Sequence, residues 1–194
     1  MVGGPGARKL DLLRGSIVQA HANGLWPHLT DVTRWPEWLR DARGREGLLR
    51  VEPLGTPSGT IDPLQPELGK RFRFTFSKGF VGDFQITYWL EPAQISLGLV
   101  RETRKDSHGI EGMIFDLDLF PQPDGATKLW FGALVMLEKD FRPSFLSPWP
   151  KRTILGWVEQ FHARVGKQGP QMAQGIRTRK EMERVFGVPA APKP

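Results

Sequence analysis

The sequence predicts a single α+β domain in which a curved antiparallel sheet wraps around a long C-terminal helix, with two short helices after the first strand. Through the middle of the chain, apolar residues recur at every second position in consecutive segments separated by short turns, which is typical of an antiparallel sheet. In the last quarter they recur every three or four positions, which indicates a helix with one buried face. The length of 194 residues suits one domain with a sizeable core.

About six or seven strands account for the alternating segments. The later segments are separated by turn sequences such as Glu91-Pro92 and Pro123-Asp124-Gly125. Because consecutive strands joined by short turns pair as neighbours, the sheet should be a meander. The expected strands span residues 10–20, 46–53, 71–76, 83–90, 95–102, 110–120 and 127–139.

Helical spacing predicts two short helices between the first two strands, where Asp31 or Thr33 can cap the second. The long C-terminal helix should begin at Pro150 and run to residue 165. Gly166, Gly169 and Pro170 should break or kink it before a second helical piece at 172–186. The apolar residues on which these helices depend are Leu25, Leu29, Val32, Trp35 and Leu39 for the short pair, and Ile154, Val158, Phe161 and Val165, with Trp157 beside them, for the long one.

The charge of the chain is concentrated near its C-terminus. The net charge is +6, yet residues 1–150 hold 18 basic and 18 acidic side chains. Residues 151–194 hold nine basic side chains against three acidic ones. We therefore divide the single domain, residues 1–194, into a flexible arm at 1–8, a neutral body and a basic extension at 167–194. Such an extension suits either a solvated helix face or weak contact with an anionic membrane or an acidic partner.

Several classes of protein are excluded by what the sequence lacks. The absence of cysteine removes disulfides, thiolate metal sites and cysteine nucleophiles. No segment has the length of apolar sequence that a membrane helix needs, and the N-terminus lacks the pattern of a signal peptide, so we expect a cytoplasmic protein. The sequence has no residues at metal-ligand spacing and no glycine-rich loop for phosphates, so we expect no metal and no cofactor. Its aromatic residues do not alternate with basic ones, so we expect no specific binding of nucleic acid.

The segment IVQAHANGLWPHLTDVTRWPEWL resembles the opening of the SRPBCC (START-like) superfamily, especially its polyketide cyclase/dehydrase-like members. The resemblance covers about 16–165 and includes Gly69 before a strand, Trp89-x-Glu91-Pro92 at a hairpin, and a turn at 123–127. It implies the helix-grip fold and a cavity between sheet and helix, and it specifies an activity poorly. Within the opening segment, the family pattern is matched by Trp26, Leu29, Thr30, Asp31, Trp35 and Trp38.

Alternation sorts the strand residues into an apolar face, which should meet the long helix, and a polar outer face. Apolar pockets with few polar groups are typical of small-molecule sites, although the same phenylalanines also suit a filled core. Trp35 and Trp38 should pack under the sheet edge or line a portal. The residues expected to line the ligand cavity are Phe72, Phe74, Phe84, Ile86, Tyr88, Leu97, Leu99, Met113, Phe115, Phe131, Trp157 and Phe161.

Two residues are weak candidates for proton transfer. His162 lies at the edge of the helical stripe, and Tyr88 is the clearest polar member of the apolar face. Asp116 and Asp118 fall on the polar face instead, where charge pairs in solvent are expected rather than catalysis.

Binding or transport of a hydrophobic small molecule or lipid is the function that this sequence favours. The alternatives are a metal-independent cyclase, aromatase or dehydrase that uses the same cavity, and docking through the basic extension. Trp130, Leu134 and Met136 lie on the outer face of the last strand. They should be covered by the tail or by a second subunit, which would make a homodimer.

Overall fold

The computed structural model describes residues 8–40, 46–55, 66–77, 79–102, 109–138 and 151–186, and their side chains except those of 101, 102 and 173–186. Its elements, in chain order, are strands β1 (Arg8–Asp11) and β2 (Arg14–Val18), helix α1 (Ala22–Leu29), the 3-10 helix η1 (Val32–Arg34), helix α2 (Trp35–Trp38), strands β3 (Leu48–Gly55), β4 (Arg71–Phe76), β5 (Val81–Leu90), β6 (Gln94–Glu102), β7 (Ile110–Pro121) and β8 (Thr127–Leu137), and helix α3 (Lys151–Phe186).

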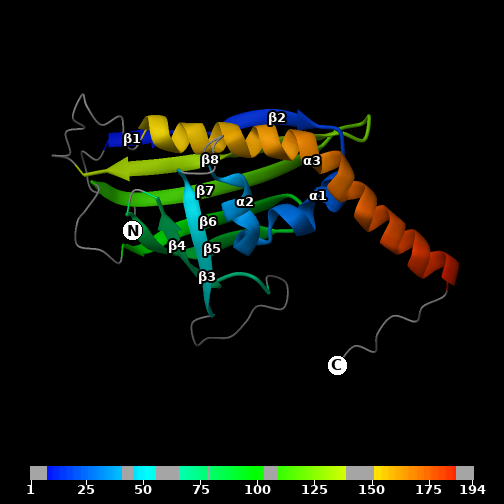
Figure 1. Ribbon diagram of the computed structural model, residues 1–194, viewed down its shortest axis with the longest axis horizontal. Coiled ribbons are helices and arrows are strands. Elements are labelled where there is room, and N and C mark those ends of the chain that lie inside the picture. The colour runs from blue at the N-terminus through cyan, green and yellow to red at the C-terminus, as the bar shows by residue number, and fades with distance from the viewer. Residues whose placement is uncertain are drawn as a thin grey trace.

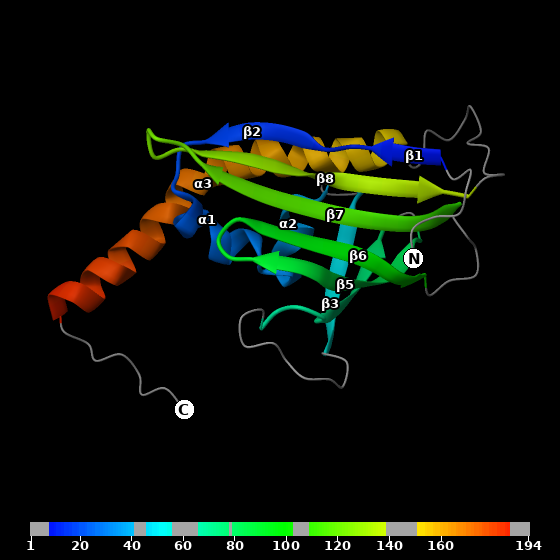
Figure 2. The ribbon, with the colours of Figure 1, turned by 180° about the vertical axis from the view of Figure 1, so that it is seen from behind.

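Eight strands in the described part of the chain form one antiparallel sheet, in the order β1-β8-β7-β6-β5-β4-β3, with β2 also paired to β8. Strands β3 to β8 follow one another as neighbours, which confirms the predicted meander. The first part of α3 runs along the sheet, and the short helices lie beside it on the same face (Figure 1). The view from behind shows the other face of the sheet without a helix over it (Figure 2).

The single strand predicted at 10–20 is divided into β1 and β2. Leu12 is buried and still donates its N–H to the Ala133 carbonyl, while Leu13 N–H is taken by the Asp11 carboxylate. Gly132 permits this crossing, because a Cβ there would lie 2.5 Å from the Leu13 Cα. The strand already begins at Arg8, one residue inside the arm predicted at 1–8.

Strand β3 forms one edge of the sheet, and a single arginine covers part of that edge. The Arg40 guanidinium donates to the carbonyl oxygens of Leu48 and Leu49, at 3.1 and 2.9 Å. The pairing of β3 with β4 shifts register at two points, around Leu49 and before Gly55. Pro53, which has no N–H to donate, also lies in this strand.

Helix α3 is kinked but not broken, which agrees with one of the two outcomes predicted for its Gly166–Pro170 segment. It runs for 36 residues with Pro170 inside it, and Figure 1 shows that it changes direction partway along and extends beyond the sheet. Gly169 lets the helix approach the sheet closely, since a Cβ there would lie 2.5 Å from Val18 Cγ1. Met172 packs against the core, so the extension predicted at 167–194 begins as part of the domain. Among the described helices, none has the length and apolar character needed to span a membrane.

The predicted apolar face is confirmed for most of its members. These residues, together with the stripe of α3, form one buried cluster between sheet and helices. Trp35 lies at its centre, with edge-to-face contacts to rings on three strands: Phe74 at 6.0 Å, Phe115 at 5.9 Å and Phe131 at 5.5 Å. Its indole Nε1 donates to the Leu29 carbonyl at 2.9 Å, so the only polar atom of the side chain is satisfied inside the core.

The face predicted for Tyr88 is wrong. The pairing of β5 with β6 steps from Ile86 opposite Leu97 to Tyr88 opposite Ser96, so Thr87 is an extra residue on β5. Such a bulge inverts the alternation beyond it. Tyr88 is therefore 42% exposed on the outer face.

Two neighbours on the same strand change face with it. Leu90 is 51% exposed, whereas Trp89 is buried and packs on Trp26 at 5.1 Å. Trp89 is thus a core residue that alternation alone assigned to the outside.

Replacing Trp35 with alanine should destabilise the fold more than any replacement on the outer face. Truncation of a buried aromatic residue lowers the free energy of unfolding by about 3–5 kcal/mol. Trp35 also contacts rings on three strands, so its loss removes packing from all three. Trp130→Ala, on the outer face of β8, is the matched control. It should lower the free energy of unfolding by less than half as much as Trp35→Ala. Denaturant unfolding measures both, and equal losses for the two variants would contradict the central place given to Trp35.

Candidate functional site

The predicted ligand-lining residues are packed against one another beneath α3. Phe131 stacks on Phe161 with ring centroids 3.9 Å apart, and Phe76 stacks on Trp157 at 5.0 Å. Of the predicted set, the buried members are Phe74, Phe84, Ile86, Leu97, Met113, Phe115, Phe131, Trp157 and Phe161, while Phe72 and Leu99 are partly buried and Tyr88 lies outside.

Trp35 and Trp38 do not lie at a portal. They are 0% and 1% exposed, respectively, because α2 carries both indoles inward. Trp38 meets the ring of Phe161 on α3 at 5.8 Å, and the Arg34 guanidinium lies over the Trp38 ring at 5.7 Å. Both tryptophans are therefore parts of the core, which corrects the portal prediction. Trp38 Nε1 has no hydrogen-bond partner among the described residues.

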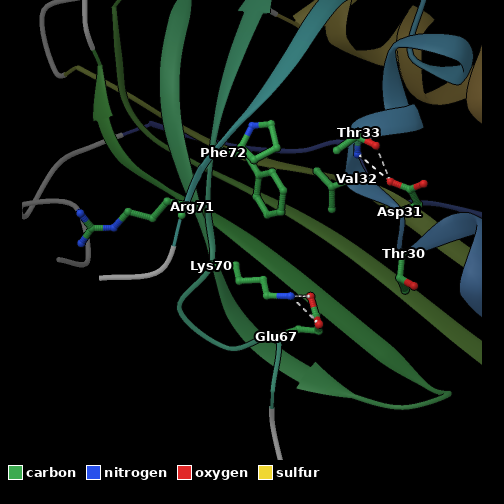
Figure 3. Close-up of a pocket in the computed structure, with 10 residues that line it drawn as sticks. Thr30, Asp31, Val32, Thr33, Glu67, Lys70, Arg71 and Phe72 are labelled. Atoms are coloured by element: carbon green, nitrogen blue, oxygen red, sulfur yellow. Dashed lines mark hydrogen bonds and ion pairs between the residues drawn. The ribbon is translucent and has the colours of Figure 1, made fainter. Parts of the chain in front are cut away.

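An open pocket of about 390 Å³ lies where the concave face emerges from beneath the short helices. We call it the open-end pocket. Val32 and Phe72 belong to the core cluster or pack against it, so the pocket continues the apolar face outward. Figure 3 shows Val32 and Phe72 facing each other across it. Its lining comes from the α1–η1 segment, the end of β3 and the start of β4, and consists of Thr30, Asp31, Val32, Thr33, Pro53, Gly55, Glu67, Lys70, Arg71 and Phe72.

Polar groups surround this apolar patch on two sides. Asp31 caps η1 through Oδ1, which accepts from the backbone N–H of Thr33 at 3.2 Å and from its hydroxyl at 2.5 Å. Asp31, one of the two cap candidates predicted, is thus the capping residue. Across the pocket, Lys70 Nζ lies 2.6 Å from both carboxylate oxygens of Glu67. Of the ten lining residues, the sequence predicted Phe72 as a ligand contact, and it marked Thr30, Asp31, Val32 and Thr33 only as motif, cap or helix positions.

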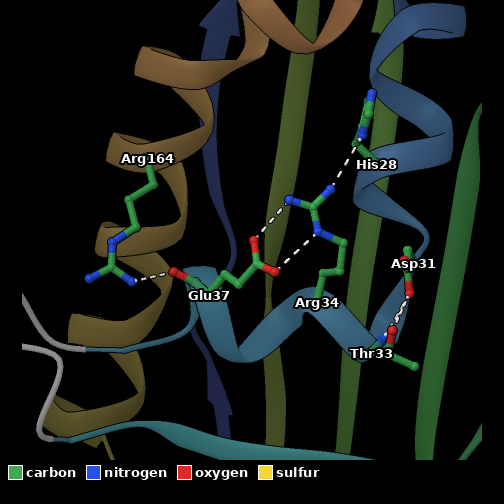
Figure 4. Close-up of polar contacts among 6 residues, drawn as sticks. All are labelled: His28, Asp31, Thr33, Arg34, Glu37 and Arg164. Atoms are coloured by element: carbon green, nitrogen blue, oxygen red, sulfur yellow. Dashed lines mark hydrogen bonds and ion pairs between the residues drawn. The ribbon is translucent and has the colours of Figure 1, made fainter. Parts of the chain in front are cut away.

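The wall formed by η1 and α2 is held to α3 by a polar network (Figure 4). Arg34 makes two bonds to the carboxylate of Glu37, at 3.2 and 2.8 Å, and lies 3.5 Å from His28 Nδ1. From α3, Arg164 donates to the Glu37 carbonyl at 2.7 Å. Hydrogen bonding to Glu37 raises the pKa of Arg34, so this guanidinium stays charged. The network fixes the position of Val32 and Asp31 relative to the long helix.

His162 links α3 to two strands, β2 through Ser16 and β8 through Phe131. Its Nε2 donates to the Phe131 carbonyl at 3.2 Å, which leaves Nδ1 to accept from the Ser16 hydroxyl at 2.7 Å. Burial lowers the pKa of His162, and the positive charge of Arg14 acts in the same direction. Both ring nitrogens are used within the fold, and His162 does not line the open-end pocket.

Asp116 and Asp118 lie on the outer face of β7, as predicted. Asp116 accepts a hydrogen bond from Ser96 at 2.5 Å, and burial, with the charge of Asp116, raises the pKa of Asp118. On the same face of the sheet, Arg73 is paired with Asp83 at 2.8 Å.

Neighbouring residues of the sheet cover part of the outer face of β8, where Trp130 and Leu134 remain half-buried. Lys128 Nζ lies 5.1 Å above the Trp130 ring, against which Gly15 also packs. Met136 occupies the space left by the missing side chain of Gly112. Cover by a tail or a second subunit stays a prediction.

The His162 contacts predict a stability that decreases on acidification. Because the folded-state pKa is below the unfolded one, this contribution is complete above about pH 6.5 and is lost as the pH falls towards the folded-state value. At pH 8, His162→Asn should cost about 1–3 kcal/mol, as for two buried hydrogen bonds. Denaturant unfolding at several pH values should show the difference from the wild type shrinking towards pH 5. A difference that does not change with pH would contradict this assignment.

Comparison with known proteins gives the fold. No family model matches the chain, and no curated protein sequence matches it. Solved structures do match. A START superfamily protein from Mycobacterium smegmatis is similar with a TM-score of 0.56 at 14% identity, over 84% of this chain and 99% of that one. Truncated norcoclaurine synthase from Thalictrum flavum is similar with a TM-score of 0.56 at 11% identity, over 84% and 98% of the two chains.

A third match is the di-domain aromatase/cyclase StfQ from the steffimycin biosynthetic pathway, with a TM-score of 0.52 and 11% identity. The similarity covers 82% of this chain and 46% of the di-domain protein, so this chain corresponds to about half of it. These proteins share the curved sheet and the long C-terminal helix, as the resemblance of the opening segment implied. The chain therefore has the helix-grip fold.

Proposed function

We propose that this protein binds an apolar small molecule in the open-end pocket, with the apolar part of the ligand held between Val32, Pro53 and Phe72. The observation that carries the proposal is the continuity of this pocket with the buried apolar face. Its volume of about 390 Å³ lies within the range of small-molecule sites. A ligand entering here meets apolar side chains without displacing the rings beneath α3.

The proteins that share the fold support a small-molecule ligand. One is named as an aromatase/cyclase of a biosynthetic pathway and another as a synthase. At these levels of identity the similarity carries only the fold, so the ligand class must come from the residues of this chain.

Two observations favour binding over the cyclase alternative. His162 is engaged by Ser16 and by the Phe131 carbonyl, so neither ring nitrogen is free to exchange a proton with a ligand. Tyr88 lies on the outer face, exposed to solvent. The two residues predicted for proton transfer therefore do not meet the proposed ligand.

A neutral fluorescent probe such as N-phenylnaphthylamine should bind saturably, with about one site per chain. Phe72→Gln should weaken this binding by about 1–2 kcal/mol, because it removes most of the apolar area on one wall. Fluorescence titration measures the affinity, and denaturant unfolding confirms that the variant is folded.

Phe120→Gln is the matched control for this experiment. Phe120 is 50% exposed and does not line the pocket, so its replacement should leave the affinity unchanged. An unchanged affinity in Phe72→Gln, or an equal loss in both variants, would refute the proposed site.

A further inference from the structure

We propose that the open-end pocket selects apolar molecules that carry a positively charged amine, and that Asp31 is the residue that recognises this group. This inference rests on the proposed function, because it concerns the same pocket, but it makes a separate claim about charge.

Asp31 lines the pocket, and one oxygen of its carboxylate accepts no hydrogen bond from the described residues. Both of its hydrogen bonds, from the N–H and the hydroxyl of Thr33, are accepted by Oδ1. Oδ2 has no partner in the part of the chain that the structure describes, and Figure 3 shows this carboxylate at the rim beside Val32. Its orientation is fixed by the capping bonds, so a ligand need not order the side chain on binding.

The other charges of the lining leave that of Asp31 uncompensated. Lys70 and Glu67 form a bidentate ion pair at 2.6 Å and largely cancel each other. Arg71 points away from the other lining residues in Figure 3, and its Nε donates to Gln85 at 3.2 Å on the neighbouring strand. Arg34 lies close enough to Asp31 to feel its charge, but both of its bonds to a carboxylate go to Glu37. The four charged residues of the described lining sum to zero, but the Arg71 side chain points away, so the unpaired charge beside the apolar patch is that of Asp31.

This arrangement fits an amphiphilic cation. The apolar part would lie against Val32, Pro53 and Phe72, while the ammonium group donates to the Asp31 carboxylate at the rim. Charge-assisted hydrogen bonds are stronger than neutral ones, so an amine gains more from this position than an alcohol does. A carboxylate of the same length would face Asp31 with like charge and should bind more weakly than the alcohol.

Displacement of the fluorescent probe by octylamine, octanol and octanoate tests this order at neutral pH. The amine should bind more tightly than the alcohol, and the alcohol more tightly than the carboxylate. Asp31→Asn should reduce the ratio of amine affinity to alcohol affinity at least about threefold, as for a solvent-accessible ion pair. The affinity for octanol should not change. Asparagine also caps helices, so the variant removes the charge while keeping the turn. Added salt should reduce the same preference in the wild type.

Glu52→Gln is the control for a general change of charge. Glu52 lies on β3 beside the pocket without lining it and is paired with Arg50 at 2.8 Å. Its replacement should leave the order of the three ligands and the ratio of amine to alcohol unchanged. If octanol displaces the probe but the amine has no advantage, or Asp31→Asn leaves the ratio intact, the charge inference is overturned while the proposed function stands. If octanol does not bind at all, both are overturned.

Discussion

The position of Trp35 is the constraint on which the rest of the structure depends. The side chain is inserted from α2 into the concave face, where it contacts rings on β4, β7 and β8 at once. Its one polar atom is satisfied by Leu29 at the end of α1, so the indole also fixes the turn between the short helices. That turn carries Asp31 and Val32. The ring that fills the middle of the sheet thus also sets the wall of the open-end pocket.

Because the Trp35 ring fills the middle of the concave face, that face has two parts with different properties. Beneath α3, rings such as Phe131 and Phe161 stack directly on one another, as side chains do in protein interiors. Beyond Trp35, the same face continues as an open pocket with charged groups at its rim. A ligand held there remains partly in contact with water, so polar groups of the ligand and salt should affect binding more than they would in an enclosed cavity.

Hydrophobic periodicity was sufficient to predict the order of the elements and the antiparallel meander, because burial of one face imposes a period of two on strands and about 3.6 on helices. The helix-grip arrangement of these elements was implied by the resemblance of the opening segment. Periodicity assigned Phe74, Phe115 and Phe131 to the buried face correctly. It misassigned Tyr88, because a bulge at Thr87 is set by pairing with β6 and leaves no mark on local alternation. The division of the first strand likewise depends on its crossing over Gly132, a contact between distant segments.

The candidate site was harder to predict than the fold. Whether aromatic residues line a cavity or fill it is a question of volume, and periodicity contains no information about volume. The pocket residues come from three loops and strand ends that approach one another only in the folded chain, so neither Glu67 nor Lys70 stood out in the sequence. Thr30 and Asp31 were visible in the sequence as part of a motif. Because Asp31 caps η1, both residues lie at the rim of the pocket in the folded chain.

The Arg40 contacts on β3 have a consequence for behaviour at high concentration. An edge strand whose carbonyls are free can accept hydrogen bonds from a strand of another molecule, which is a common route to aggregation. Here the guanidinium occupies the carbonyls of Leu48 and Leu49, and Pro53 offers no N–H further along. A charged side chain and a proline thus interrupt the hydrogen-bonding row along this edge, which should keep the molecules apart by denying them a regular ladder to extend.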